Sequence, residues 1–159
     1  MSLLTPEPLA LNGAKLSFGI VAARYNPALV DALLRKVLAL LADAGVKERR
    51  IEVVRVPGSH EVPVAAQWLA QGGKRDCVIA LGVLIGGDTN HHEMVGQSVS
   101  QALQQVSLAT HTPVINGVIV ANTLKQAQAR CLGSINRGAE FARAALEMAA
   151  LNRAIGAKS

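Results

Sequence analysis

The residues best suited to chemistry lie in one stretch, residues 79–95, where an apolar run meets a glycine pair and then a polar segment. The run is unbroken, as expected for a strand covered on both faces. An amphipathic helix is predicted from about His91, so backbone N–H groups and the positive end of a helix dipole would face one point. Such a point suits an anion such as phosphate, and a histidine on its rim can transfer a proton near neutral pH. Chemistry on a phosphorylated small molecule needs both features. The residues between the run and the helix are Gly86, Gly87, Asp88, Thr89 and Asn90.

Several of these residues also have an ordinary structural explanation. The glycines and Thr89 match neither the Walker A nor the GxGxxG motif, so alone they are an unspecific anion signal. His91 and His92 lack the further ligands of a zinc site, and no metal site is predicted. Successive helical residues point about 100° apart, so only one of the two histidines can face a site. Arg130, near a predicted helix end, is adequately explained as a solvated or dipole-complementing residue.

Polar residues follow other apolar runs as well. Tyr25 is either ordinary surface or a flat platform for a planar ring. Asn26 precedes Pro27 and is explained as a helix N-cap, although it could also hydrogen-bond a hydroxylated ligand. Glu61 stands at a predicted helix start, and complementing the helix dipole is the simpler interpretation of its charge.

Strands alternate with helices four times along the chain, which predicts a parallel sheet with helices on both faces. Strands are predicted at residues 16–23, 51–56, 76–85 and 113–120. Helices are predicted at residues 27–44, after 57–61, at 91–110, around 123–130 and at 136–155. The expected inner faces of the first and third helices are Leu29, Leu33, Val37, Leu40 and Leu41, and Val95, Val99, Leu103, Val106 and Leu108.

Parallel sheets of this kind bind ligands at the carboxyl ends of their strands, at a switch point. All four strand exits are predicted to present polar residues there, which favours one composite site. The residues expected at this edge are Tyr25, Asn26, Ser59, His60, Glu61, Gly87, Asp88, Thr89, Asn90, His91, Asn116 and Gly117.

Length and composition predict one domain and exclude several classes of protein. A chain of 159 residues, half of them hydrophobic, can bury a proper core. Residues 1–14 carry two prolines and are predicted to form a flexible N-terminal arm, with a single domain over residues 15–159. No signal peptide or membrane span is predicted, so a cytoplasmic location is expected. The net charge of +5 is scattered and aromatic residues are only 3% of the chain, which argues against nucleic-acid binding.

The two cysteines, Cys77 and Cys131, are far apart and have no metal-ligand spacing. Cys77 lies in an apolar run and is predicted to be a reduced core thiol. Cys131 follows a basic residue, which leaves a reactive thiol as an alternative. Structurally inert cysteines are the simpler expectation for a cytosolic protein.

Five blocks, in order and with nearly constant spacing, resemble the 6,7-dimethyl-8-ribityllumazine synthase family. They are FGIVAARYN, VPGSHEVP, ALGVLIGGDTNHHEMV, PVINGVIVANTLKQAQAR and NRGAEFARAALEM, and the resemblance spans essentially residues 16–155. It implies a flavodoxin-like three-layer α/β/α sandwich with a four-stranded parallel sheet. It also implies a riboflavin-pathway transferase without metal or organic cofactor. That family condenses 5-amino-6-(D-ribitylamino)uracil with 3,4-dihydroxy-2-butanone 4-phosphate.

The resemblance assigns expected roles to individual residues. Tyr25 would stack on the pyrimidine ring, and His91 would shuttle protons. Asn116 would lie where a neighbouring subunit closes over the ring, and Arg130 would reach the phosphate from that neighbour, with Arg137 replacing a lysine near the site. The ribityl chain and ring would be held by Asn26, Ser59, His60 (through its backbone) and Glu61. The phosphate would be held by Gly87, Asp88 and Thr89, and the end of the third strand would add Val83, Leu84 and Ile85.

The implied partners are the two substrates, further copies of the chain in a pentamer or an assembly of pentamers, and riboflavin synthase. Neither nucleic acid nor a membrane is expected. The chain departs from the family pattern at Gly86, where arginine is common, and at Asn90, His60 and His92. The link after Arg130 is one residue shorter than in common relatives, which leaves the assembly state open.

Two other functional classes fit the same predicted scaffold. A non-catalytic flavin or lumazine carrier would bind product without turnover, but His91 and Arg130 are both present. A phospho-receiver domain needs an acidic pair after the first strand and an aspartate ending the third, and this chain has neither. A shell-forming role remains as an addition to catalysis.

Overall fold

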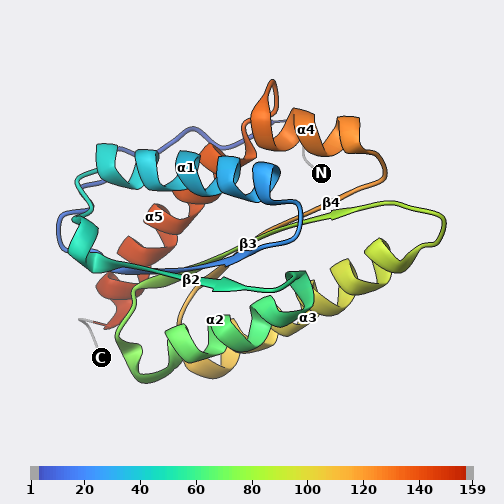
Figure 1. Cartoon of the computed structure of the whole chain (residues 1–159). Helices are drawn as coiled ribbons and strands as arrows, with labels where there is room; N and C mark the ends of the chain where they lie inside the picture. Colours follow the sequence, from blue (N-terminus) through green and yellow to red (C-terminus); the bar gives the residue numbers. More distant parts are fainter. Residues whose placement is uncertain (1–3, 157–159) are drawn as a thin grey trace.

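The four predicted strands form one parallel sheet in a computed structural model that describes residues 4–156 (Figure 1). The strands are β1 (Phe18–Ala23), β2 (Ile51–Val56), β3 (Cys77–Ile85) and β4 (Val114–Ala121). The helices are α1 (Pro27–Asp43), α2 (Val62–Ala70), α3 (His91–Thr110), α4 (Leu124–Leu132) and α5 (Arg137–Gly156). Short 3-10 turns form η1 (Glu48–Arg50), η2 (Ser59–Glu61) and η3 (Gln71–Gly73).

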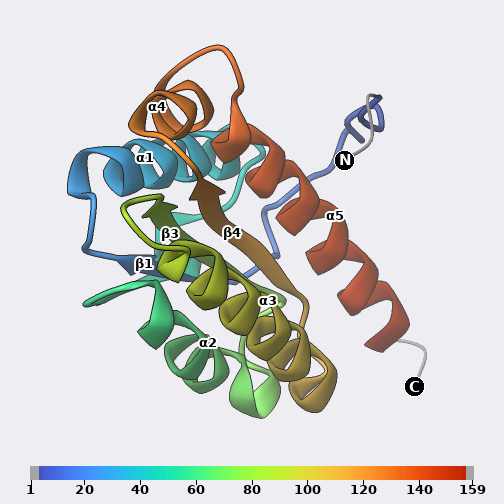
Figure 2. The same cartoon turned by 90° about the vertical axis from the view of Figure 1, so that its right-hand side faces the viewer.

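Helices cover both faces of the sheet, which explains why its central strands are apolar along their whole length. Figure 2 shows α1, α4 and α5 on one face, and α2 and α3 on the other. Alternate residues of β1 enter the two cores: Phe18 and Ile20 pack on the first face and Val21 on the second. The predicted three-layer sandwich is therefore confirmed.

The strand order is β2-β1-β3-β4, which matches the flavodoxin-like order as far as it extends. The chain leaves β1 on one side to form β2 and on the other side to form β3, so the direction of winding reverses between β1 and β3. The register sets Ala23 beside Val56, so β1 and β2 end together, while β3 continues to Ile85. The switch point predicted to bind ligand therefore lies between the ends of β1 and β3.

The predicted boundaries agree with the structure to within about two residues. Strand β1 begins at Phe18 rather than residue 16, because the Asp76 carboxylate accepts the backbone N–H of Ser17 at 2.7 Å. The prediction that Leu108 faces inward is wrong, since that side chain is 69% exposed. The inward stripe of α3 continues past Val106 at helical spacing and leaves Leu108 on the outer side.

Residues 4–14 lead into the sheet along the α1 and α5 side. The Gly13 N–H donates to the Ala44 carbonyl at 2.7 Å, and Leu11 packs against the core. The division into a flexible arm (1–14) and a domain (15–159) stays a prediction, and residues 1–3 and 157–159 lie outside the described part of the chain. Within the described part, no helix combines the length and apolarity that crossing a membrane requires.

Both cysteines are buried and free. Burial raises the pKa of the Cys77 thiol far above its usual range, and the nearby Asp76 carboxylate adds to the effect. Burial also raises the pKa of Cys131 to about 11, although Lys36 and Arg130 oppose the shift. A thiol with so high a pKa is almost wholly protonated at neutral pH, so the interpretation of Cys131 as reactive is not supported.

Candidate active site

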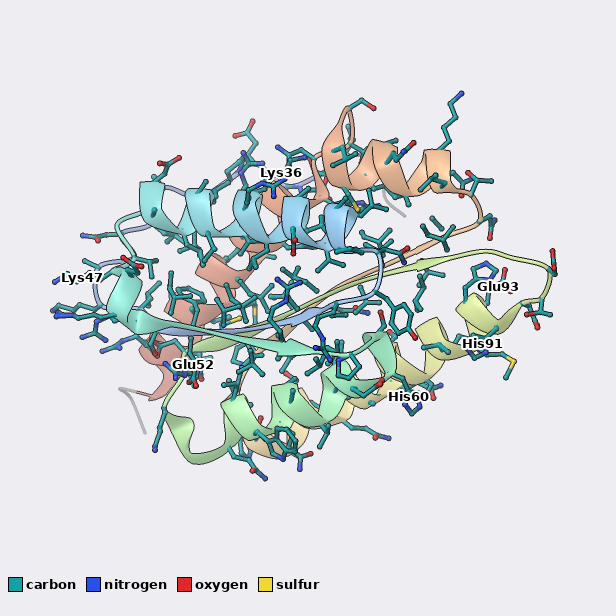
Figure 3. All side chains as sticks on the ribbon, viewed as in Figure 1. Lys36, Lys47, Glu52, His60, His91 and Glu93 are labelled. Carbon is teal, nitrogen blue, oxygen red and sulfur yellow. The ribbon has the colours of Figure 1, made fainter. Side chains whose placement is uncertain are left out.

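The exits of β1 and β2 are joined by backbone hydrogen bonds at the carboxyl edge of the sheet. The Pro57 carbonyl accepts the N–H groups of Arg24 and Tyr25, both at 3.2 Å. This places the residues after β1 beside the turn that carries His60. Figure 3 shows His60 and His91 toward the same end of the sheet, with Lys47 at the opposite end. The first three predicted strand exits therefore share one edge.

Tyr25 presents an exposed ring at this edge. Its side chain is 71% exposed, which leaves a face for a planar ligand. The ring lies against Gly58: a Cβ added there would stand 3.0 Å from the Tyr25 Cδ2 atom and 3.8 Å from the Glu61 carboxylate. A glycine before Ser59 thus allows the ring and the carboxylate to lie side by side. Sequence analysis missed Gly58, although its place within the PGSHE turn was a usable signal.

Asn26 cross-links the switch point instead of capping α1 with its side chain. It occupies the N-cap position with φ 55, a left-handed conformation that asparagine tolerates better than most residues. Its side chain makes no cap hydrogen bond, and the amide Nδ2 donates to the Val83 carbonyl at 2.8 Å. Asn26 is therefore the N-cap residue of α1, as predicted, but its side chain does not cap the helix. The bond ties the exit of β1 to the end of β3.

Ser59 lies beneath the surface of the edge, whereas His60 and Glu61 are exposed. The Ser59 Oγ is buried and has no hydrogen-bond partner among residues 4–156. It packs on Gly82 of β3, where an added Cβ would stand 2.5 Å from the hydroxyl. At the end of β3, Val83 is buried, and Leu84 and Ile85 are half-buried. Ser59, Val83, Leu84 and Ile85 therefore lie beneath the surface of the site and are less accessible to a ligand than Tyr25, His60 and Glu61.

The loop between β3 and α3 is exposed and ends in a helix start. Gly87, Asp88 and Thr89 are exposed, as is His91 in the first turn of α3. The Thr89 Oγ1 accepts the His91 N–H at 3.3 Å. A helix start of this kind offers backbone donors and a positive dipole end to an anion.

Asn116 does not lie at the carboxyl edge, contrary to the prediction. It is the third residue of β4 and pairs with Ala80 in the middle of β3, and the apolar run continues to Ala121. With Arg130 and Arg137 it lines a separate hollow of about 210 Å³ beside the outer edge strand β4. The predicted residues therefore form two groups, one at the carboxyl edge and one on the flank of β4.

His92 and Asn122 form a contact near the carboxyl edge that the sequence analysis did not predict. His92 is buried, and its Nε2 lies 3.1 Å from the Oδ1 of Asn122, the residue that follows β4. The signal for Asn122 was available, because it is the first polar residue after the apolar run 117–121. Among residues 4–156, no group of three or more His, Cys, Asp or Glu side chains is arranged to hold a metal ion.

The carboxyl edge can hold a flat ring against Tyr25 and an anion at the start of α3, with an imidazole nearby. The family model for 6,7-dimethyl-8-ribityllumazine synthase matches residues 15–153. Among similar proteins, the 6,7-dimethyl-8-ribityllumazine synthase of Xylella fastidiosa (strain M12) is 42% identical over 142 residues, 89% of this chain and 92% of that protein. The protein of the same name from Xanthomonas campestris pv. campestris (strain B100) is 46% identical over 132 residues, 82% and 86% of the two chains. The protein of that name from Xanthomonas oryzae pv. oryzae (strain PXO99A) is 44% identical over the same length. This chain belongs to the 6,7-dimethyl-8-ribityllumazine synthase family.

Proposed function

We propose that this chain condenses 5-amino-6-(D-ribitylamino)uracil with 3,4-dihydroxy-2-butanone 4-phosphate, in a site formed by the carboxyl edge of one subunit and the β4 flank of its neighbour. One observation supports a site shared between subunits: the predicted site residues lie in two separate groups on the chain. Asn116, Arg130 and Arg137 line their own hollow beside an edge strand, away from the strand exits that carry the other predicted residues. In an oligomer, the hollow of one subunit can lie against the carboxyl edge of the neighbouring subunit.

In this proposal the edge holds the two substrates side by side. Tyr25 stacks on the pyrimidine, and the neighbour's backbone at Asn116 covers the other side of the ring. The ribityl chain and ring polar groups are held by Asn26, Ser59, His60 and Glu61 over a floor formed by Val83, Leu84 and Ile85. The phosphate loop, residues 87–90, binds the phosphate through Gly87, Asp88 and Thr89, while Arg130 and Arg137 of the neighbour add positive charge.

The chemistry needs positioning and one proton carrier. The uracil amine attacks the ketone to give a carbinolamine, which loses water to form an imine. Loss of phosphate, tautomerisation, ring closure and loss of a second water complete the lumazine. His91 is proposed to carry protons between these groups. Holding two reactants in register can contribute ~7–11 kcal/mol, more than a single acid–base group supplies.

A head-to-tail contact between identical chains forms a ring when the rotation between neighbours closes, and a pentamer is the proposed minimal unit. An exposed apolar residue in the hollow beside β4 supports such a contact: Val120 of β4 lines it and is 42% exposed. Assembly of pentamers into a shell, contact with riboflavin synthase and a cytoplasmic location are further parts of this proposal. The buried free thiols suit a reducing compartment.

The direct test is to mix the two substrates with the purified chain and follow the appearance of lumazine absorbance. Catalysis predicts product formation in proportion to enzyme concentration and equal release of inorganic phosphate. A carrier on the same scaffold would bind lumazine without forming it, so tight binding without turnover would contradict the proposal.

A further inference from the structure

We propose that His92 is a positioning residue that, through its hydrogen bond to Asn122, fixes the end of the phosphate loop against the exit of β4. The inference deepens the proposed function and rests on it. His92 is the second residue of α3, and its side chain is only 10% exposed, so it does not itself reach a substrate. Its effect on the reaction would pass through the loop and through the adjacent His91.

The geometry defines which ring nitrogen makes the contact. The His92 Nε2 lies 3.1 Å from the Asn122 Oδ1, and an amide oxygen can only accept, so Nε2 carries the proton and donates. The Glu93 carboxylate lies farther from the same nitrogen, at 3.9 Å. The contact therefore joins the first turn of α3 to the residue that follows β4.

The Nδ1 of His92 indicates that shape alone does not explain why this position is a histidine rather than an apolar aromatic residue. The Nδ1 of His92 is buried and has no hydrogen-bond partner within residues 4–156. A buried acceptor without a partner costs stability, and an apolar ring of similar size would avoid that cost. The hydrogen bond through Nε2 is the property that an apolar ring would lack.

The start of the loop is fixed at the same place by the backbone. The Gly86 N–H donates to the Ala121 carbonyl at 2.8 Å. Gly86 also lies against Asn122, the residue that follows Ala121. A Cβ added at Gly86 would stand 2.5 Å from the Asn122 carbonyl oxygen. The phosphate loop thus lies between two fixed points. Gly86, before the loop, bonds to Ala121, and His92, after it, bonds to Asn122. Gly86 and His92 therefore hold the two ends of the loop against the same two residues.

Asn122 is itself held firmly, so it can serve as an anchor. Its backbone N–H donates to the Gln126 Oε1 at 2.8 Å. The Gln126 N–H in turn donates to the Oγ1 of Thr123, the N-cap of α4, at 3.1 Å. A rigid anchor would transmit loss of the His92 contact to the loop rather than absorb it.

The test compares His92→Phe with His92→Gln in the assembled enzyme. Phe keeps the ring and loses the donor, so the KM for the ketose phosphate should rise by roughly two- to tenfold while the KM for the ribitylaminouracil stays unchanged. The melting temperature should not fall, because the unpartnered Nδ1 is removed. Gln places an amide donor near the former Nε2 and should restore the KM.

Two more variants separate the hydrogen bond from other effects. Asn122→Ala should raise the same KM, and the double variant with His92→Phe should add nothing further, as expected for one interaction. Glu93→Gln removes the neighbouring charge without touching the bond and should leave both KM values unchanged.

The outcomes distinguish this inference from the proposed function. Absence of turnover in the unaltered enzyme would refute the proposed function, and the inference with it. Normal turnover with an unchanged phosphate KM in His92→Phe would refute the role of His92 alone. An equal rise in both KM values, or failure of Gln to restore the phosphate KM, would reduce His92 to a purely structural residue and overturn the inference.

Discussion

At the scale of single residues, His91 is exposed in the first turn of α3, beside the loop proposed to bind phosphate. General acid–base catalysis by one group contributes roughly 10²–10⁴-fold, less than the positioning of two reactants can supply. We therefore expect His91→Ala to lower kcat by roughly 10²–10⁴-fold and to leave turnover above the uncatalysed rate. Lumazine absorbance under saturating substrates measures this. A folded variant that binds both substrates and is wholly inactive would show that the proton transfer dominates instead.

Arg130 is predicted to act on the phosphate and not on the ring. Its guanidinium Nη1 donates to the Gln126 carbonyl one turn earlier at 3.0 Å, at the hollow beside β4. A charge-assisted hydrogen bond is worth ~1.5–3 kcal/mol, so Arg130→Ala should raise the KM for the ketose phosphate by roughly ten- to hundredfold. Steady-state kinetics with the phosphate substrate varied measures the change. Lys125→Ala, an exposed cation on the same helix, is the matched control and should leave this KM unchanged.

At the scale of elements, β4 depends on a glycine that sits beneath α5. A Cβ added at Gly117 would stand 2.6 Å from the Ala80 carbonyl oxygen, 2.8 Å from the Leu81 side chain and 3.0 Å from the Phe141 ring. Because one of these neighbours is backbone, Gly117→Ala should lower the free energy of unfolding by about 1–3 kcal/mol. Urea denaturation checks this, with Gly156→Ala as control, since among residues 4–156 a Cβ added there would meet nothing within 4 Å outside its own helix. An equally stable Gly117→Ala protein would mean that β4 and α5 can separate at little cost.

The hydrophobic pattern was enough to predict the elements and the sheet. The central strands β1 and β3 are bounded apolar runs, and the edge strand β2 is rich in valine and isoleucine although it contains Glu52 and Arg55. The pattern was less reliable where a side chain serves a tertiary contact. Asn26 was predicted to cap α1, yet its amide bonds to Val83 of a strand 57 residues away, which no local pattern reveals. Asn116 was expected at the carboxyl edge, although the strand predicted at residues 113–120 already contained it. The run resumes to Ala121, so the true exit is Asn122.

At the scale of the whole molecule, the proposed shared site predicts that each catalytic site draws on two copies of the chain. Mixed assemblies of His91→Ala and Arg130→Ala subunits should then contain some complete sites, each with His91 from one subunit and Arg130 from the next. Random mixing in equal amounts in a closed head-to-tail ring makes about a quarter of the sites complete. Activity at low ketose phosphate concentration should therefore exceed the sum of the two separate variants after denaturation and joint refolding. Refolding His91→Ala with the double variant His91→Ala/Arg130→Ala offers no complete site and should show no such gain. If both mixtures behave alike, or if the active species elutes as a monomer in gel filtration, His91 and Arg130 do not meet across a subunit boundary.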